Sequence, residues 1–386
     1  ITALAFDMSA AGAATFNSTV SGTIATFSGD VNARNFTGVD DGNTFINFPG
    51  SDIIKLNTAG ISRFQIAADG SLSTPTLGTQ NLRLGANAGN SIASGGNYNT
   101  LIGDGAGTDF TTGCVQNVAL GVDALANDVK GCSSVAIGSY ALNAQSFSST
   151  TNAFNTAVGD LAGLKVTTGI RNTLLGAAAG DAITDADENE AVGYAALSAN
   201  VLGSGSVAVG SFALNLQNPA SAATMYNVAV GNGAGAGLTT GTQNTLIGGL
   251  AGDALGVAYS NVAVGFEALT TDVNGRSSTA IGTQALKVQN YSSSTHSYNT
   301  AVGYQAGAAV TTGINNTLIG ASAGDAVTTG SSNSFMGTNA GGGVVGGSAT
   351  QGNHNIAVGL NALVDTTALT TGSHNIAIGN FTRTNA

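Results

Sequence analysis

Charged residues are scarce in this chain of 386 residues, and most of those present are acidic. Only 8% of the residues are charged, and ten lysines and arginines stand against 21 aspartates and glutamates, which gives a net charge of −11. A surface that binds nucleic-acid phosphates needs clustered basic side chains. The composition therefore argues against nucleic acid as a partner.

Long apolar runs are also missing, although the mean hydropathy is positive at +0.21. No stretch approaches the roughly 18 apolar residues that a membrane-spanning helix requires. No signal peptide or other targeting segment is recognisable. We therefore expect no insertion into a membrane.

Residues that usually build metal and catalytic sites are few. The three histidines, His296, His354 and His374, have no cysteine or acidic residue at metal-ligand spacing. No nucleophile elbow, phosphate-binding loop or paired-cysteine motif occurs. We expect neither a metal nor a cofactor, and no enzymatic activity.

The chain has only two cysteines, Cys114 and Cys132. They lie in the connections that lead into consecutive copies of a repeat. If these copies stack one strand spacing apart, the two Cα atoms fall within disulfide reach. Two alternatives stay open: a disulfide, which requires an oxidising, extracellular setting, or two buried thiols.

Glycine, in contrast, is abundant, with 57 residues. It closes a five-residue motif, seen plainly at Asn117–Gly121, that recurs seventeen times. Repetition at a nearly fixed period indicates one elongated solenoid rather than several globular domains. The closing glycines are Gly85, Gly103, Gly121, Gly138, Gly159, Gly176, Gly193, Gly210, Gly231, Gly248, Gly265, Gly282, Gly303, Gly320, Gly337, Gly359 and Gly379.

With the closing glycine numbered zero, the motif has a constant pattern. Position −4 is Asn or Ser, position −2 is mostly Ala, position −1 is aliphatic or Met, and position +3 is nearly always Ala. Such a short run is typical of a β-strand, in which side chains alternate between two faces. We expect position −1 to fill the interior of each coil, position −2 to face a partner chain, and the stacked Asn side chains to form an amide ladder.

A second period is nested in the first. From Gly138 the spacings follow the order 21, 17, 17, 17, and Gly159, Gly231 and Gly303 start successive blocks of this 72-residue period. This indicates that a four-coil block was duplicated. We predict an all-β fold in which residues 81–386 form a parallel β-roll of about seventeen coils, with the blocks beginning near residue 155. Its thin interior favours an intertwined homotrimer.

Residues 1–80 lack the repeat. Alternating runs at 23–27, 44–48 and 63–66 predict strands, and Gly-Asp, Asp-Gly and Pro-Gly pairs between them predict turns. We interpret this region as a β-rich shaft or connector segment.

The motif at Asn155–Ala162 and Asn299–Ala306 resembles the head repeat of YadA-like trimeric adhesins. It is also similar to repeats in bacteriophage tail fibres and related virion proteins. The resemblance implies a left-handed parallel β-roll of three chains around one axis, located on a virion or a cell surface. It also implies a host receptor or glycan as partner, and other virion or fibre proteins at the N-terminal end. The period of this chain is longer than that of the adhesin repeat.

The longer spacing places a twelve-residue connection in each block, at 143–154, 215–226 and 287–298. Loops on a rigid scaffold commonly carry binding residues, and exposed aromatic rings suit recognition of sugars or proteins. The alternative is that these rings pack the connection onto the roll. The candidate receptor contacts are Phe147, Phe154, Tyr226, Tyr291 and Tyr298.

One dense acidic group comprises Asp185, Asp187, Glu188 and Glu190. Paired carboxylates serve glycoside hydrolysis, several together hold calcium, and the simplest alternative is a solvated loop.

Taken together, the repeat and its resemblance favour a trimeric attachment fibre like that of a phage tail. The rivals are a bacterial trimeric autotransporter-type adhesin, an extracellular filament subunit, and a tailspike-type depolymerase using Asp187 and Glu190.

Overall fold

The computed structural model describes residues 35–37, 44–48, 53–66, 68, 72–74, 78, 80–342, 352–364 and 372–382. These residues form strands and turns, and they contain no helix that is long and apolar enough to cross a membrane. The chain divides into two compact units, residues 1–70 and 71–386, whereas the predicted boundary followed residue 80. The strand predicted at 23–27 lies outside the described residues.

The first unit contains an antiparallel sheet of β1 (Asn35–Thr37), β2 (Phe45–Asn47), β3 (Ile54–Thr58) and β4 (Ile61–Ile66). A two-residue turn joins β3 to β4, and both of its residues, Ala59 and Gly60, have positive φ. Such a turn matches the twist of a hairpin. The strands predicted within 44–48 and 63–66 are thereby confirmed.

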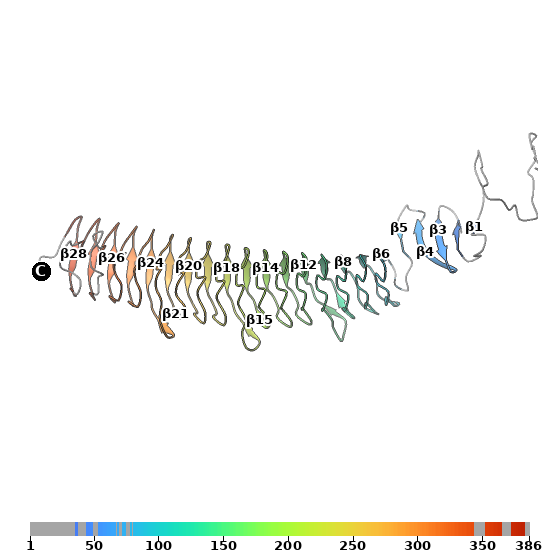
Figure 1. Ribbon diagram of the computed structural model, residues 1–386, viewed down its shortest axis with the longest axis horizontal. Coiled ribbons are helices and arrows are strands. Elements are labelled where there is room, and N and C mark those ends of the chain that lie inside the picture. Colours follow the sequence, from blue (N-terminus) through green and yellow to red (C-terminus); the bar gives the residue numbers. More distant parts are fainter. Residues whose placement is uncertain are drawn as a thin grey trace, which may run out of the picture. The chain divides into compact units, whose positions relative to one another are not determined.

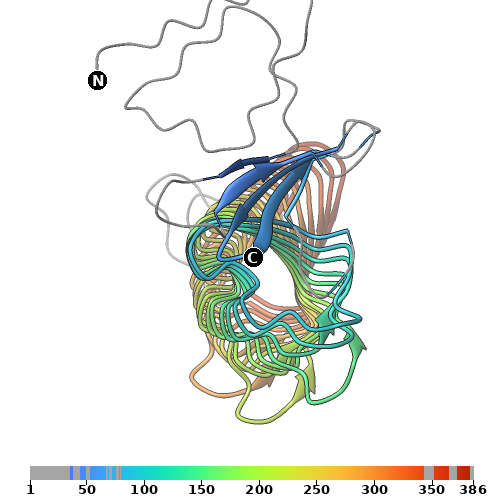
Figure 2. The ribbon, with the colours of Figure 1, turned by 90° about the vertical axis from the view of Figure 1, so that its right-hand side faces the viewer.

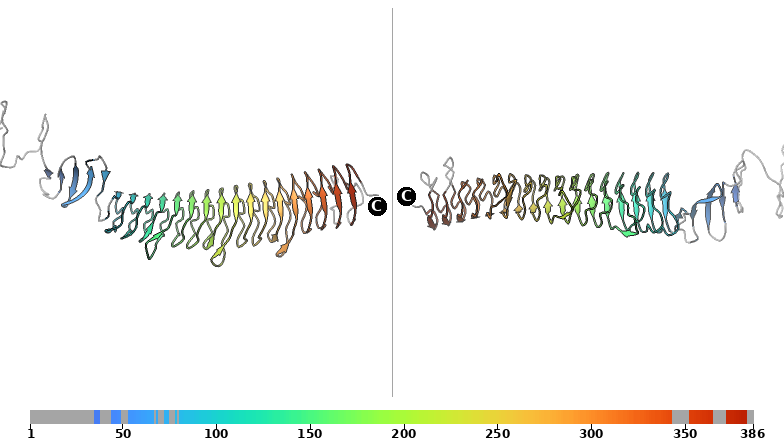
Figure 3. Two further views of the ribbon diagram at one scale, coloured as in Figure 1. Left: turned by 180° about the vertical axis from the view of Figure 1, so that it is seen from behind. Right: turned by 90° about the horizontal axis from the view of Figure 1, so that it is seen from below.

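The second unit contains β5 (Leu72–Ser73) and a parallel ladder of seventeen strands, one for each copy of the motif. Each strand comprises positions −3 to −1 and pairs in register with the same positions of the next coil, from β6 at one end to β28 at the other (Figures 1 and 3). The predicted all-β solenoid is confirmed. The strands are β6 (Leu82–Leu84), β7 (Thr100–Ile102), β8 (Val118–Leu120), β10 (Val135–Ile137), β12 (Thr156–Val158), β13 (Thr173–Leu175), β14 (Glu190–Val192), β16 (Val207–Val209), β18 (Val228–Val230), β19 (Thr245–Ile247), β20 (Val262–Val264), β22 (Thr279–Ile281), β24 (Thr300–Val302), β25 (Thr317–Ile319), β26 (Ser334–Met336), β27 (Ile356–Val358) and β28 (Ile376–Ile378).

The three long connections carry short extra strands and project from the same side of the roll (Figures 1 and 2). Each extra strand pairs in parallel with one in the preceding connection, which extends the stacking beyond the main ladder. The pairs are β9 (Gly131–Cys132) with β11 (Thr151–Asn152), β15 (Gly203–Ser204) with β17 (Ala223–Thr224), and β21 (Gly275–Arg276) with β23 (Thr295–His296).

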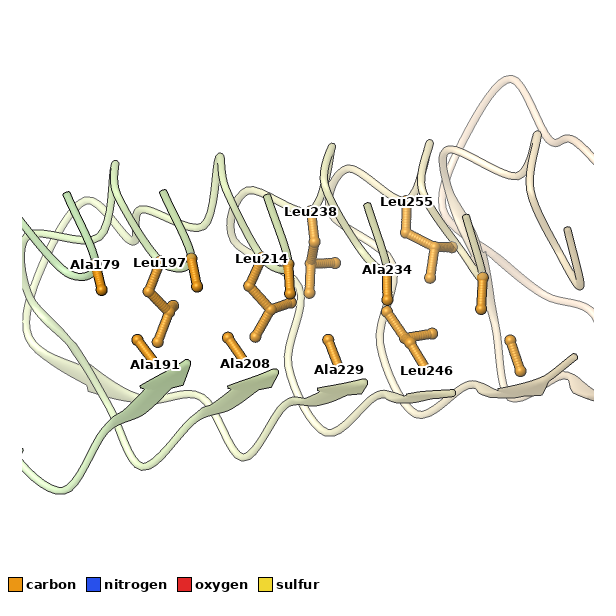
Figure 4. Close-up of a cluster of buried hydrophobic side chains, with 14 of the residues drawn as sticks. Ala179, Ala191, Leu197, Ala208, Leu214, Ala229, Ala234, Leu238, Leu246 and Leu255 are labelled. Atoms are coloured by element: carbon orange, nitrogen blue, oxygen red, sulfur yellow. The ribbon is translucent and has the colours of Figure 1, made fainter. Parts of the chain in front are cut away.

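The interior of each coil is lined by position −2 of the strand and by positions +3, +4 and +7 of the returning segment. In Figure 4, Ala208 and Ala229 on the strands lie opposite Leu214 on the returning wall. Where the strand supplies a leucine, as at Leu246, position +4 is glycine. A Cβ added to Gly252 would lie only 2.8 Å from Leu246 Cδ2, so the small and large residues compensate within each coil.

The predicted orientation of the strand faces is wrong. Position −2 points into the coil and is buried, whereas position −1 points outward, as Leu120, Ile247 and Met336 show with 40%, 39% and 52% exposure. Position −4 shares its face with position −2, and its Asn side chains are buried. The interior is too thin to hold a branched residue from every strand in addition to the leucines of the opposite wall.

The closing glycines stack directly on one another. Gly248 has φ of +133°, and an added Cβ would lie 2.5 Å from the carbonyl oxygen of Gly265 in the next coil. Both the positive φ and the close backbone approach exclude a side chain. This explains why glycine closes every copy of the motif.

The predicted amide ladder is confirmed. Asn172 Oδ1 accepts hydrogen bonds from the backbone nitrogen (3.0 Å) and Nδ2 (3.3 Å) of Asn189 in the next coil. Asn172 Nδ2 donates to Ala186 O at 2.9 Å, so the buried amide is satisfied on both sides. The same pattern continues through the other consecutive Asn residues of position −4.

Candidate binding surfaces

The outward sides of the seventeen strands form one continuous surface, which we call the outward face and define as positions −3 and −1 of β6 to β28. Its residues are Val, Ile, Leu, Thr, Ser and Met, with Glu190 as its single charged residue. Exposure rises to 64% and 67% at Ile376 and Ile378. Apolar surfaces this extended commonly mark an interface.

The terminal aromatic residues of the three long connections are exposed. Phe154, Tyr226 and Tyr298 are 56%, 63% and 57% exposed, and all three have φ near +50°. They occupy position −5, immediately before the buried Asn of position −4. More than half of the surface of each residue is thus open to solvent, and the prediction that they contact a receptor stays open.

The two aromatic residues inside the connections have the packing role instead. Phe147 and Tyr291 are only 6% and 5% exposed. The Tyr291 hydroxyl donates to Gly313 O at 2.7 Å and accepts from Asn299 Nδ2 at 3.3 Å. Burial raises the pKa of Tyr291 well above its ordinary value. In this chain, neither ring is presented to a partner.

The connection at 287–298 contributes to a cluster of aromatic and basic side chains on three successive coils. Arg276 Nη1 donates to the Tyr259 hydroxyl at 2.8 Å, and Arg276 Cζ lies 4.1 Å from the centroid of the Tyr259 ring. The Tyr259 hydroxyl also lies 3.4 Å from His296 Nε2. The His296 ring stacks on Tyr298, with centroids 5.4 Å apart and an angle of 12° between the planes. We now number the blocks by the long connection that ends each of them, so that the first, second and third blocks end at residues 154, 226 and 298. We call these four residues the third-block cluster.

Of this cluster, only Tyr298 is predicted from the sequence as a binding residue. The available signal was departure from the 72-residue period. The first block carries Val115, Cys132, Asn152 and Phe154 at the equivalent positions, and the second carries Asp187, Ser204, Thr224 and Tyr226. Only the third block combines two tyrosines, an arginine and a histidine there.

The interior contains two buried carboxyl groups at position +7, Asp128 and Asp272. Asp128 Oδ1 accepts from Gly131 N at 2.7 Å, and Oδ2 accepts from Gln145 Nε2 at 2.6 Å. Burial raises the pKa of Asp128 to about 6 from its ordinary 3.8, against these hydrogen bonds. Burial also raises the pKa of Asp272.

Ser replaces Asn at position −4 once in each block, and its side chain is too short to continue the amide ladder. There, Gln145 or its equivalent connects the Ser to the Asn of the next coil. Gln145 Oε1 accepts from Asn155 Nδ2 at 2.8 Å, and Gln145 Nε2 lies 3.1 Å from Ser134 Oγ. The second and third blocks repeat this arrangement with Gln217 and Gln289. These groups are thus structural parts of the interior.

The acidic residues at 185–190 make separate contacts and do not form one group. Asp185 accepts hydrogen bonds from the hydroxyls of Thr167 and Thr168, which lower the pKa of Asp185. Glu188 forms an ion pair with Arg171 at 2.7 Å.

The other two residues of this group, Asp187 and Glu190, lie apart from those contacts. Asp187 accepts from Ile170 N at 2.8 Å, and Glu190 lies on the outward face. Within the described ranges, no three His, Cys, Asp or Glu side chains are grouped so that they could hold a metal ion.

Cys114 and Cys132 are buried, free thiols. Cys114 Sγ donates to Val129 O at 2.7 Å, and Cys132 Sγ donates to Gly113 O at 2.8 Å. Burial raises the pKa of Cys114 to about 12 and also raises that of Cys132. A disulfide between them stays a prediction.

Comparisons with protein-family models, with curated proteins and with solved structures find no match to this chain.

Proposed function

We propose that this chain is the subunit of a homotrimeric attachment fibre, similar to a bacteriophage tail fibre, which binds a cell surface through its connections. The outward face carries this proposal. At about 4.8 Å for each strand spacing and 3.3 Å for each residue, seventeen three-residue strands present a surface of roughly 800 Å². That is the area each partner buries in a typical stable interface between two chains, and in a trimer it is shared between two neighbours.

A second and a third copy of this chain fit the outward face better than an unrelated partner. The face repeats the same positions coil after coil, so copies aligned in parallel match strand for strand along the whole ladder. Its near absence of charge suits the core of an obligate oligomer. The resemblance of the motif to trimeric adhesin repeats supports three copies over two.

The oligomeric state is tested by light scattering on the purified chain at two concentrations. We expect a mass three times that of the 37.6 kDa chain. Val264→Glu, which places a carboxylate at the centre of the outward face, should dissociate the trimer. Ser221→Glu adds the same charge to an exposed position of a long connection and should leave the mass unchanged. A wild-type mass equal to that of one chain would contradict the proposal.

Attachment is tested separately, by retention of the fluorescently labelled trimer on a panel of bacterial cells. The Val264→Glu protein is the matched control, because it keeps every connection but presents them on single chains. We expect retention of the trimer on at least one strain and a loss of avidity in the variant. Equal retention of the two proteins would refute attachment through a multivalent fibre.

A further inference from the structure

We propose that the third-block cluster, Tyr259, Arg276, His296 and Tyr298, is a binding site for a saccharide that carries a carboxylate. This inference rests on the proposed attachment function and names a ligand class for it. The cluster lies on the connections that lead into the strands, outside positions −3 to −1 that define the outward face.

Arg276 supplies the charge that selects a carboxylate. The two ion pairs among the described residues join Arg171 to Glu188 and Lys287 to Glu267, so Arg276 has no acidic partner there. One of its donors is used by Tyr259, and its Nε is enclosed by the protein without a hydrogen-bond partner in the described part of the chain, so a ligand carboxylate would bind at the two Nη nitrogens. A guanidinium binds a carboxylate through two parallel hydrogen bonds. At physiological salt the net charge of −11 is screened beyond about 8 Å, so the local charge decides.

The stacked pair of His296 and Tyr298 supplies a platform for a sugar ring. Tyr298 is 57% exposed, and stacking on His296 fixes the orientation of its ring. The C–H groups on one side of a pyranose pack against the face of an aromatic ring, and its hydroxyls remain free to bond with polar neighbours. A flat ring near a guanidinium that has no acidic partner among the described residues thus matches a sugar acid in both shape and charge.

The cluster is also held in place before any ligand arrives. The Tyr259 hydroxyl accepts from Arg276 and can donate to His296 Nε2. On the other side of the imidazole, Nδ1 lies 3.3 Å from Ser277 Oγ. Arg276 and His296 themselves are register partners in the paired strands β21 and β23. Such preorganisation reduces the entropy lost on binding.

The chain contains its own control site. Tyr226 in the second block has the same position in its connection as Tyr298, similar exposure (63% against 57%) and a similar φ (51° against 48°). Its neighbours are Asp187, Ser204 and Thr224 in place of Tyr259, Arg276 and His296. If exposure of an aromatic ring were sufficient, both sites would bind; the proposal requires that only the third-block cluster does.

The experiment is calorimetric titration of the whole protein with tetragalacturonate and with 3′-sialyllactose, which carry a carboxylate on different ring skeletons. The neutral counterparts are the methyl ester of tetragalacturonate and lactose. The variants are Arg276→Ser, which introduces the residue of the second block, together with Tyr298→Ala and Tyr226→Ala. Tetraglutamate serves as a non-saccharide carboxylate, and circular dichroism confirms that each variant is folded.

We expect one of the acidic saccharides to bind at one site per chain and its neutral counterpart to bind at least tenfold more weakly. Arg276→Ser and Tyr298→Ala should each weaken binding at least tenfold, and Tyr226→Ala should change it less than twofold. The proposal is overturned if neither acidic saccharide binds, if Tyr226→Ala weakens binding as much as Tyr298→Ala, or if tetraglutamate binds equally well. If neither saccharide binds while the trimer still attaches to cells, this inference alone fails; loss of cell attachment in every strain refutes the attachment function instead.

Discussion

Replacing Asp128 by Asn should stabilise the roll at neutral pH, and the gain should disappear in acid. The pKa of Asp128 is about 6 in the folded chain and 3.8 when it is not buried. Between these values the folded state binds more protons than the unfolded state, so the free energy of unfolding decreases as the pH rises. A difference of about two pKa units corresponds to roughly 3 kcal/mol. The cost of the buried carboxylate is absent below pH 3.8 and complete above pH 6.

The second block shows how Asn fits this position. Asn200, the equivalent of Asp128 one block later, accepts from Gly203 N at 2.9 Å and donates from Nδ2 to Gly203 O at 2.7 Å. Gln217, the equivalent of Gln145, keeps its bond from Asn227 at 2.9 Å. The variant therefore has a set of hydrogen bonds that the same fold already uses, and no unpaired polar group is expected.

The measurement is urea unfolding followed by circular dichroism at pH 4 and pH 8, at one protein concentration, for the wild type and Asp128→Asn. We expect the variant to be more stable by about 3 kcal/mol at pH 8 and nearly equal to the wild type at pH 4. Asn200→Asp is the reciprocal control and should lose stability at pH 8 only. A difference between variant and wild type that is the same at both pH values would refute the reasoning, because it would exclude ionisation of Asp128 as its cause.

Three further predictions concern packing and reactivity. Leu246→Ala removes a fully buried side chain and should lower the free energy of unfolding by about 2–5 kcal/mol, measured by the same urea titration. Gly248→Ala places a Cβ at positive φ against Gly265 O and should lower the free energy of unfolding by roughly 2–6 kcal/mol. Gly256→Ala, whose Cβ would meet its nearest neighbour at 3.4 Å, should be close to neutral. Equal effects of the two substitutions would contradict the stacking of the closing glycines. Iodoacetamide should alkylate Cys114 in the folded chain roughly a thousandfold more slowly than in the unfolded chain, because burial raises its pKa to about 12 from 9.0, and mass spectrometry that finds rapid labelling would contradict this.

The repeat architecture was predictable because one local sequence pattern occurs seventeen times. The strands, their parallel stacking, the glycine column and the Asn ladder all follow from residues within one coil. The direction of the strand faces did not follow, because alternation defines two faces without saying which is inside. The Asn residues indicate the inward face. An amide ladder at position −4, as at Asn172, is buried, and position −2 lies on the same face of the strand, so position −2 must also point inward. The large side chain at position −1 was therefore a weaker indicator of the buried face than the Asn at position −4, which shares its face with position −2.

The third-block cluster was not predictable from residue types alone, since Tyr259, Arg276 and His296 lie on three different coils and are far apart in the sequence. Stacking of coils brings them together, and it does so at every block. What distinguishes one block from another is therefore the set of positions that break the 72-residue period. Changes at interior positions must keep the contacts of the coil, as the exchange of Asp128 for Asn200 with the same bond from a glycine nitrogen shows. Side chains on the connections that face solvent have few packing contacts to keep, so substitutions there are tolerated more easily. A duplicated roll can therefore acquire a binding site in one block while the coils of the other blocks keep their stacking.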